Sequence, residues 1–169
     1  MDTMETILSR RSIRKYTSAA IPEPIIQSIL RAAMNAPSAG NEQPWQFVVI
    51  QDRSMLEAIS KVHPYASMLT EAPVAILICG DLELEKHKGF WTQDCSAATQ
   101  NMLLAIHSYG LGGVWLGIYP REDRCAGIQK LLNLPSKIMP FALVPMGYPA
   151  ETKPKADRYS PSRVKYDHW

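Results

Sequence analysis

Hydrophobic residues recur at helical spacing in several separate stretches of the chain. In the clearest of them, positions 25, 26, 29, 30, 33 and 34 are all apolar, and Pro37 ends the pattern. Spacings of three and four residues place such side chains on one face of a helix. Ser54, with Glu57 three residues later, has the pattern of a capping box that begins another helix. The pattern predicts helices over residues 3–9, 24–35, 54–62, 90–109 and 121–132.

Shorter apolar runs between these helices predict strands. Residues 45–50 (WQFVVI) are β-branched and aromatic, and residues 74–80 (VAILICG) are apolar throughout, as expected for a central strand covered on both faces. Residues 114–118 and 141–146 predict two more strands, and Pro145 favours an edge or a bulge in the second, because proline has no backbone N–H. The alternation predicts a sheet with helices on both sides, of the α+β or α/β class.

Residues 150–169 are polar, basic and proline-containing, with no hydrophobic periodicity. They predict an arm and not a packed element. The arm and the broad helix surface leave much of the molecule to be covered, which a partner subunit would do.

Composition narrows the class of protein. The chain has 169 residues, with 46% hydrophobic and 20% charged residues, as expected for one compact domain over residues 1–169. A net charge of +2 is too small to indicate a nucleic-acid-binding protein. The first residues do not resemble a signal peptide, and no apolar run approaches the roughly 20 residues that a membrane helix needs. A cytoplasmic protein with no membrane segment is therefore expected.

Cysteine and histidine residues offer no obvious reactive or metal site. Cys79, Cys95 and Cys125 are far apart and odd in number, so they form neither a CxxC pair nor a disulfide framework. Cys79 lies in an apolar run and is predicted to be a small core residue. The four histidines lack metal-ligand spacing, so no metal is expected.

Positive charge concentrates near both termini. Of the 18 lysines and arginines, four lie in residues 10–15 and five in residues 150–169. In an extended segment Arg10, Ser12 and Arg14 would share one face, whereas in a helix Arg10 and Arg14 would be like-charged neighbours. Either arrangement gathers donors that suit a phosphate, although a solvated basic patch would have the same sequence.

Two loops could hold a ligand. Residues 36–45 (APSAGNEQPW) form a rigid loop that presents backbone N–H groups and short amides, or else an ordinary helix-to-strand connection. Residues 110–117 (GLGGVWLG) lack the GxGxxG spacing and precede a strand, which excludes a Rossmann site. Their glycines indicate either a tight turn or backbone that approaches something flat and bulky, and a turn does not explain Gly117.

Basic and aromatic residues alternate in the C-terminal arm. Such a tail could bind RNA or a membrane surface, but Glu151, Asp157 and Asp167 dilute its charge. Neither a nucleic acid nor a membrane is expected as a partner.

Together these segments resemble the nitroreductase-like FMN-dependent flavoproteins. The matching pieces are RRSIRKY, APSAGNEQPWQFVVI, DCSAATQNMLLAIHSYGLGGVWLGIYP and MGYPAETKPKADRYSPSRVKYDHW, in that order. The resemblance implies an α+β fold with a mixed, mainly antiparallel sheet flanked by helices. It also implies a homodimer with FMN at the subunit interface and a C-terminal arm that extends over the partner subunit.

The resemblance also assigns residues to the cofactor. The RxSxR segment contacts the phosphate and ribityl chain, with Arg14 nearest the pyrimidine edge of the ring, where a positive group tunes the flavin potential. The 37–43 loop reaches the flavin from the other subunit, the backbone near Gly117 faces N5, and the arm closes on the phosphate. The residues assigned are Arg10, Arg11, Ser12, Arg14, Pro37, Ser38, Ala39, Asn41, Gln43, Leu116, Gly117, Lys155 and Arg158.

The chemistry implied is hydride transfer from NADH or NADPH, followed by reduction of a small acceptor such as a nitroaromatic, a quinone or an enone, in a ping-pong scheme. No protein residue is assigned a catalytic role, because the flavin carries the reaction. A dimer that sequesters FMN without efficient turnover is the alternative. Trp91 and Tyr119 are candidates for the substrate cleft, and Asp94, Gln100 and Asn101 fit the long central helix, where they could be structural.

Overall fold

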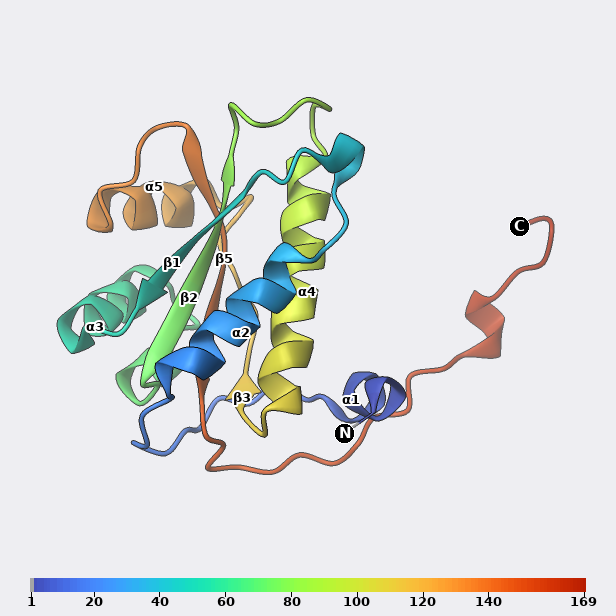
Figure 1. Cartoon of the computed structure of the whole chain (residues 1–169), viewed down its shortest axis with the longest axis horizontal. Coiled ribbons are helices and arrows are strands. Elements are labelled where there is room, and N and C mark those ends of the chain that lie inside the picture. The colour runs from blue at the N-terminus through green and yellow to red at the C-terminus, as the bar shows by residue number, and fades with distance from the viewer. Residues whose placement is uncertain (1) are drawn as a thin grey trace.

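The computed structural model describes residues 2–169, which form an open sheet between two layers of helices (Figure 1). The helices are α1 (Thr3–Ser9), α2 (Glu23–Met34), α3 (Arg53–Val62), α4 (Trp91–Ser108) and α5 (Glu122–Leu131), with 3-10 turns η1 (Ala39–Asn41), η2 (Ser67–Thr70) and η3 (Pro161–Arg163). The strands are β1 (Trp45–Ile50), β2 (Val74–Asp81), β3 (Gly112–Gly113), β4 (Leu116–Gly117) and β5 (Ile138–Gly147).

The sheet has the order β1-β2-β5-β3, and β4 also pairs with β5. The pairs between these strands are antiparallel, and a single parallel bridge joins Ser12 to Gly113. Every residue of β2 is buried, which confirms the predicted central strand. Of the strand predicted over residues 114–118, only Leu116–Gly117 is observed, as the short β4, while β3 lies just before the predicted range.

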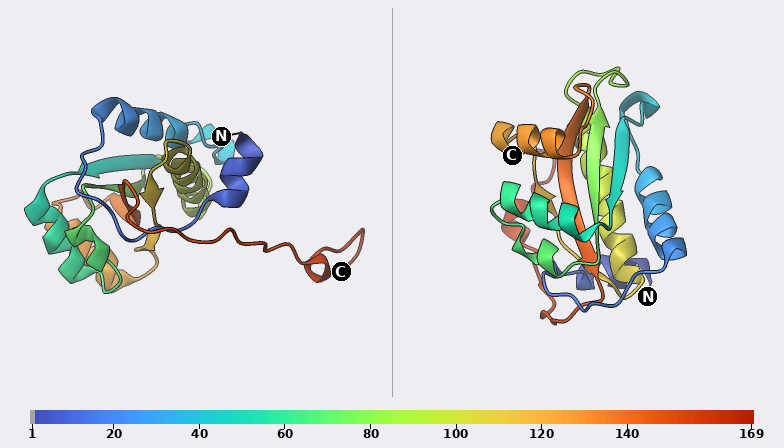
Figure 2. Two further views of the ribbon diagram at one scale, coloured as in Figure 1. Left: turned by 90° about the horizontal axis from the view of Figure 1, so that it is seen from below. Right: turned by 90° about the vertical axis from the view of Figure 1, so that its left-hand side faces the viewer.

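Helices cover both faces of the sheet, as the turned views show (Figure 2). On one face α2 and α4 pack together over a core that includes Ile26, Ile76 and Met102. On the other face α3 and α5 cover a second core that includes Leu56, Leu77 and Ile128. The sheet therefore separates two apolar cores, which explains why its central strand has no polar face.

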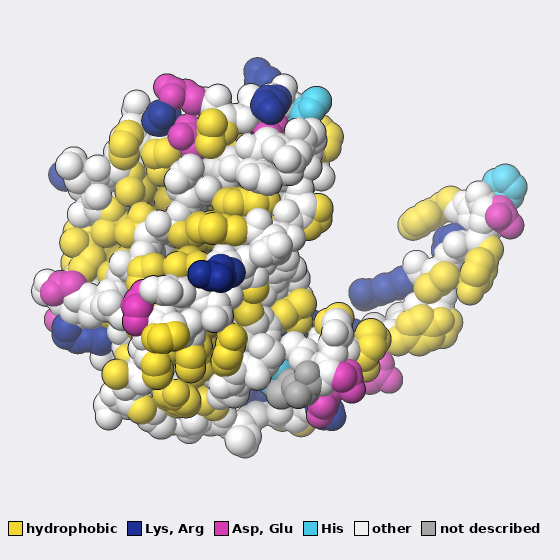
Figure 3. Space-filling model, viewed as in Figure 1, with side chains coloured by type: hydrophobic (Ala, Val, Ile, Leu, Met, Phe, Trp, Pro, Cys, Tyr) yellow, Lys and Arg dark blue, Asp and Glu magenta, His cyan; other side chains and the backbone are white. Residues whose placement is uncertain are grey.

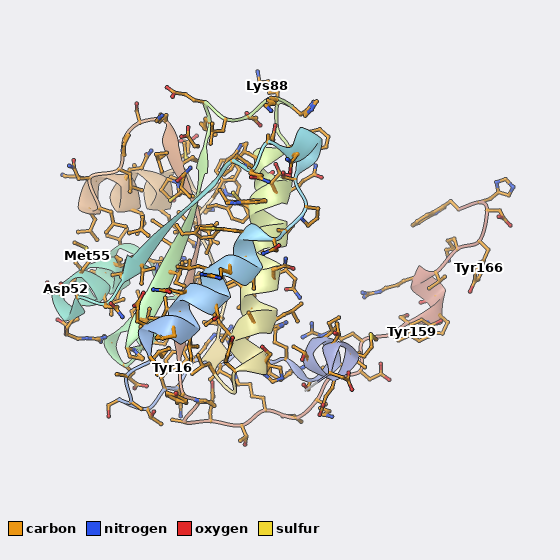
Figure 4. The ribbon with its side chains drawn as sticks, viewed as in Figure 1. Tyr16, Asp52, Met55, Lys88, Tyr159 and Tyr166 are labelled. Atoms are coloured by element: carbon orange, nitrogen blue, oxygen red, sulfur yellow. The ribbon has the colours of Figure 1, made fainter. Side chains whose placement is uncertain are left out.

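Helix α3 begins one residue earlier than predicted. The Asp52 carboxylate accepts a hydrogen bond from Met55 N at 2.8 Å, so Asp52 is the N-cap and Ser54 lies inside the helix (Figure 4). The predicted capping box at Ser54 is wrong. A carboxylate satisfies a free N–H and also interacts favourably with the positive end of the helix dipole, so Asp52 takes the cap position.

Strand β5 is not the edge strand that Pro145 suggested, because it pairs with β2 on one side and with β3 and β4 on the other. The Pro145 carbonyl accepts from Val114 N, so its ring nitrogen faces the same side, where pairing stops between β3 and β4. The missing N–H therefore falls at a break in the ladder. The register shift lies elsewhere, between Ile78 and Cys79 of β2.

The arm over residues 150–169 first runs along the body, where Lys153 donates to Ser12 O and residues 156–159 lie beside α1, and then extends away from it (Figures 1 and 2). Its only regular element among the described residues is the turn η3, so the tail forms no packed helix or strand, as predicted. Among residues 2–169, no helix combines the length and apolarity needed to cross a membrane.

Candidate functional site

The segment that follows α1 is extended, which decides between the two conformations considered for the N-terminal arginines. Ile13 N donates to Gly113 O at 3.1 Å, next to the Ser12–Gly113 bridge. The Tyr16 hydroxyl donates back to Ile13 O at 2.6 Å. Because the helix ends at Ser9, Arg10 and Arg14 are not neighbours on a helix.

Three arginines from opposite ends of the chain gather beside α1. Arg10, Arg11 and Arg158 line a cavity of about 220 Å³, together with Ile7 and Leu8 of α1 and arm residues 156–159. Burial, and then the charges of Arg158 and Arg11, lower the pKa of Arg10. Within residues 2–169 none of the three guanidinium groups has a carboxylate at ion-pair distance. The exposed Asp157 lines the same cavity but forms no ion pair with these arginines, so the cluster is a partly buried site of net positive charge.

A second cavity of about 220 Å³ lies on the other side of Arg11, between the end of α4 and the arm. Lys153 lines it and donates from Nζ to Ser12 O at 2.9 Å. Sequence reasoning did not assign Lys153, although it stands two residues before the assigned Lys155. Burial, and then the charge of Arg10, lower the pKa of His107 in the same cavity.

Two of the assigned basic residues lie apart from these cavities. Arg14 is exposed, and its backbone N donates to Glu151 at 2.6 Å. Lys155 is exposed in the arm. Neither belongs to the lining of the two cavities in this single chain.

The glycines of residues 110–117 have different reasons to be small. A Cβ on Gly112 would lie 2.6 Å from Ile13 Cβ, so this glycine permits close packing of the arginine segment. Gly117 is exposed, and a Cβ added there would meet nothing within 4 Å. Open space beside Gly117 is consistent with backbone that faces a ligand, and the packing of the single chain does not require glycine there.

Two side chains contact the carbonyl oxygen of Gly117. Arg124 Nη1 donates to it at 2.8 Å, and His63 Nε2 lies 2.9 Å away. His63 Nδ1 accepts from Tyr65 N at 3.2 Å, so in a neutral ring the proton is on Nε2, which donates to Gly117. Neither was assigned from the sequence: His63 follows the end of α3, 54 residues before Gly117, and Arg124 lies in α5, seven residues after it.

The 37–43 loop is rigid and folded on itself. Gly40, Asn41 and Gln43 have positive φ angles of 52°, 54° and 49°, which glycine and amide residues tolerate best. Gln43 N donates to Ser38 Oγ at 3.1 Å, and Gln43 Nε2 donates to Asn41 Oδ1 at 2.9 Å. The side chains of these amides thus also stabilise the loop.

Asp94 fastens this loop to the first turn of α4 by accepting from Ala39 N at 2.9 Å. Asn101 donates from Nδ2 to Ala32 O at 3.2 Å and joins α4 to α2. Both polar positions therefore have structural partners. The loop lies at one end of α4 and the chain around Arg10 at the other (Figure 1).

The distance between these regions follows from α4. His107, whose ring lies 2.7 Å from Ser9 Oγ at the end of α1, follows Asp94 by 13 residues of continuous helix. At about 1.5 Å per residue they are about 20 Å apart. One chain therefore does not bring the loop and the arginine cluster to the same side of one small ligand.

Trp91 does not line a cleft, which corrects one of the two substrate-cleft candidates. It is 6% exposed and makes edge-to-face contacts with Phe141 at 5.9 Å and Tyr119 at 4.8 Å. Its ring occupies the space that a Cβ on Gly80 would need. Tyr119 is 40% exposed at the edge of this aromatic group.

Comparisons with known proteins agree with the motifs. The chain matches the model of the Nitroreductase family over residues 7–64 and 56–148. A Methanothermobacter thermautotrophicus protein, provisionally named NADH dehydrogenase/NAD(P)H nitroreductase, is 53% identical over 169 residues, covering 100% of this chain and 88% of the relative.

Solved structures extend the agreement to the fold. A Parabacteroides distasonis protein with the same provisional name matches with a TM-score of 0.95 and 40% identity, covering 99% of this chain and 98% of that one. A Desulfovibrio desulfuricans protein, provisionally named a nitroreductase and solved in complex with FMN, matches with a TM-score of 0.86 and 30% identity, covering 100% and 99%. The resemblance inferred from the motifs and the α+β fold that it implied are both confirmed. The chain belongs to the Nitroreductase family.

Proposed function

We propose that this protein binds FMN between two copies of the chain and uses it to reduce a small organic acceptor with electrons from NADH or NADPH. The observation that carries the proposal is the cluster of Arg10, Arg11 and Arg158, which is partly buried and has no carboxylate partner. The FMN bound by the D. desulfuricans relative supports the choice of cofactor.

The cluster fits a phosphate group. Guanidinium groups donate paired hydrogen bonds to phosphate oxygens, and a dianion would relieve the repulsion that lowers the pKa of Arg10. The arm residue Arg158 closes on Arg10 from the same chain. Lys153 would add a further charge near Ser12.

The other assigned residues fit the flat ring. Pro37 and Ala39 give the loop an apolar surface beside a shallow cavity of about 350 Å³, which Phe90 also lines. Gly117 leaves its backbone open. The carbonyl bonds from His63 and Arg124 would keep that backbone in one orientation.

The proposal requires a homodimer, because about 20 Å of α4 separates the loop from the arginine cluster within one chain. The arm is suited to an interface, since it carries exposed Tyr159, Tyr166 and Trp169. Figure 3 shows hydrophobic and basic side chains side by side along it. Exposed Met4 and Leu8 of α1 offer further apolar surface to a partner.

Bound FMN would supply the redox chemistry, accepting a hydride from the nicotinamide and delivering reducing equivalents to a nitroaromatic, quinone or enone acceptor, with donor and acceptor using the site in turn. The chain's own residues bind the phosphate, place the ring and exclude water. None of the three cysteines is exposed, and the pKa of each is raised, with burial the largest cause, so a thiolate nucleophile is not available.

Stopped-flow mixing of the FMN-loaded protein with NADH and with NADPH tests the proposal. We expect the flavin absorbance to bleach with at least one donor and to return when an acceptor is added. A flavin that stays oxidised with both donors would refute the reductase function and favour the alternative, a dimer that only sequesters FMN. Sedimentation of the purified protein should give a dimer; a monomer that retains FMN would refute the shared site.

A further inference from the structure

Two carboxyl groups are buried together where the 37–43 loop meets α4. Glu42 of the loop is 6% exposed and Asp94 in the first turn of α4 is 4% exposed. Carboxyl groups are rarely buried to this extent unless each oxygen has a partner. Each of the four carboxyl oxygens is therefore expected to have a hydrogen-bond partner.

Backbone N–H groups satisfy one oxygen of each carboxyl. Glu42 Oε2 accepts from Lys86 N at 2.7 Å and from His87 N at 3.1 Å. Asp94 Oδ1 accepts from Ala39 N at 2.9 Å. These bonds join three segments: the loop, the turn after β2 and the start of α4.

The other two oxygens, Glu42 Oε1 and Asp94 Oδ2, are buried and have no hydrogen-bond partner among the described residues. Each carboxyl group influences the pKa of the other, so the two lie close together, and a hydrogen bond between them would require one of them to carry a proton. Two ionised carboxylates in this position would repel each other without water to screen them.

The surroundings place that proton on Asp94. Burial, together with the neighbouring Glu42, raises the pKa of Asp94. Burial opposes ionisation of Glu42 as well, but the N–H groups of Lys86 and His87 and the bond from Asp94 outweigh it, so the pKa of Glu42 is lowered. Glu42 is therefore the carboxylate and Asp94 the donor.

We propose that a single proton, held by Asp94 and donated to Glu42, locks the 37–43 loop onto α4 and so makes the loop's position depend on pH. That this loop faces the cofactor rests on the proposed function above; the lock itself does not. Asp94 and Glu42 are positioning residues in this proposal, since they act through the loop.

The charged groups around the pair are few. The imidazole of His87 faces Glu42 and covers Gly40, where an added Cβ would lie 2.5 Å from Nε2. The Glu85 carboxylate faces Asp94 and also helps to raise its pKa. Lys86 contributes its backbone N–H, and Lys88 lies on the same turn above the loop (Figure 4).

The direction of the pH effect follows from the shifts. Folding raises the pKa of Asp94. Its contribution to stability is therefore complete below the ordinary pKa of about 4, and is lost as the pH rises through the pKa of the folded state. Folding lowers the pKa of Glu42, so its contribution is complete above its own ordinary value, also about 4, and is lost as the pH falls through the folded value. The loop should therefore loosen as the pH rises through the folded pKa of Asp94, when the shared proton leaves.

Amide substitutions distinguish a lock that depends on a shared proton from a contact that does not. In Asp94→Asn, the amide nitrogen replaces the proton donor toward Glu42, while the amide oxygen still accepts from Ala39. In Glu42→Gln, the donor lies on the other side and Asp94 is free to ionise. The double variant places two N–H donors face to face, just as deprotonation places two acceptors face to face. Each single variant should keep the lock, and the double variant should break it.

Hydrogen exchange at the Ala39 amide measures the lock in the full-length protein, with FMN and after its removal. In the wild type we expect the protection factor to fall by roughly tenfold or more as the pH rises through the folded pKa of Asp94. Asp94→Asn should abolish that fall. The double variant should be roughly tenfold less protected than either single variant at every pH. Glu57→Gln, an exposed change on α3, is the matched control and should behave as wild type.

Two results would overturn the proposal: a fall in protection with rising pH that persists in Asp94→Asn, or a double variant as protected as the single ones. Infrared spectroscopy of the wild type gives a check that needs no folded variant, since a protonated carboxyl band must disappear over the same pH range in which the protection falls. If exchange behaves as expected but FMN affinity is unchanged in the double variant, the lock stands and the placement of the loop on the cofactor fails.

Discussion

Replacing Arg10 by Met should weaken FMN binding without weakening the fold. Methionine keeps an apolar stem of similar reach and removes only the charge and its N–H donors. In the FMN-free protein burial, and then repulsion from Arg158 and Arg11, lower the pKa of Arg10, and it has no ion pair with a carboxylate among the described residues. Its removal should therefore leave the stability of the FMN-free protein unchanged or slightly higher.

The magnitude follows from the kind of bond lost. A hydrogen bond to a charged group contributes about 1.5–3 kcal/mol, which corresponds to roughly a 10- to 150-fold change in Kd. Arg10 is half-buried, so the upper part of this range is expected for Arg10→Met. Arg158 is exposed and more strongly screened by salt, so about tenfold is expected for Arg158→Met. Because the two groups are neighbours, their effects should not add.

The assay is titration of FMN-free protein with FMN by quenching of flavin fluorescence at two salt concentrations, alongside thermal unfolding without FMN. Arg121→Met is the matched control, since Arg121 is an exposed arginine whose nearest carboxylate is Asp123 at 3.7 Å. If Arg10→Met lowers the melting temperature of the FMN-free protein as much as it lowers affinity, the cluster is structural. An unchanged Kd would show that the phosphate binds elsewhere.

Three further results are expected. Gly112→Ala should destabilise the protein by about 1–3 kcal/mol in denaturant unfolding, because its Cβ would lie 2.6 Å from Ile13. Gly117→Ala has open space around its Cβ, so this variant should keep its stability and lose FMN affinity. The reverse pattern would contradict the proposed site. Arg53→Met should cost about 2–4 kcal/mol in the same assay, because Arg53 donates to the carbonyls that end η2; a loss below 1 kcal/mol would refute its role there. Burial raises the pKa of Cys79 to about 12, so it should resist a thiol reagent at pH 8 until unfolding; rapid labelling of the native protein would contradict its burial.

Local patterns along the chain were sufficient for most helices and strands. The strand predicted over residues 45–50 has the observed bounds of β1, and the buried run over residues 74–80 became the central strand β2. Such runs depend on which residues are apolar and on the residues that begin and end them, and both are written locally. Pro145 misled because its effect depends on what its nitrogen faces, and it faces the break between β3 and β4, where no N–H is needed.

The arrangement of the site depended on the tertiary structure. The motifs named the arginines and the loop, but only the fold shows that the length of α4 lies between them. Lys153 contacts Ser12 across 141 residues of sequence, and Asp94 holds Ala39 across 55. Sequence periodicity reports which face of an element is apolar, because burial acts on each residue separately. A hydrogen bond requires one particular donor to contact one particular acceptor. For residues this far apart in sequence, only the packed fold determines which donor and acceptor come into contact.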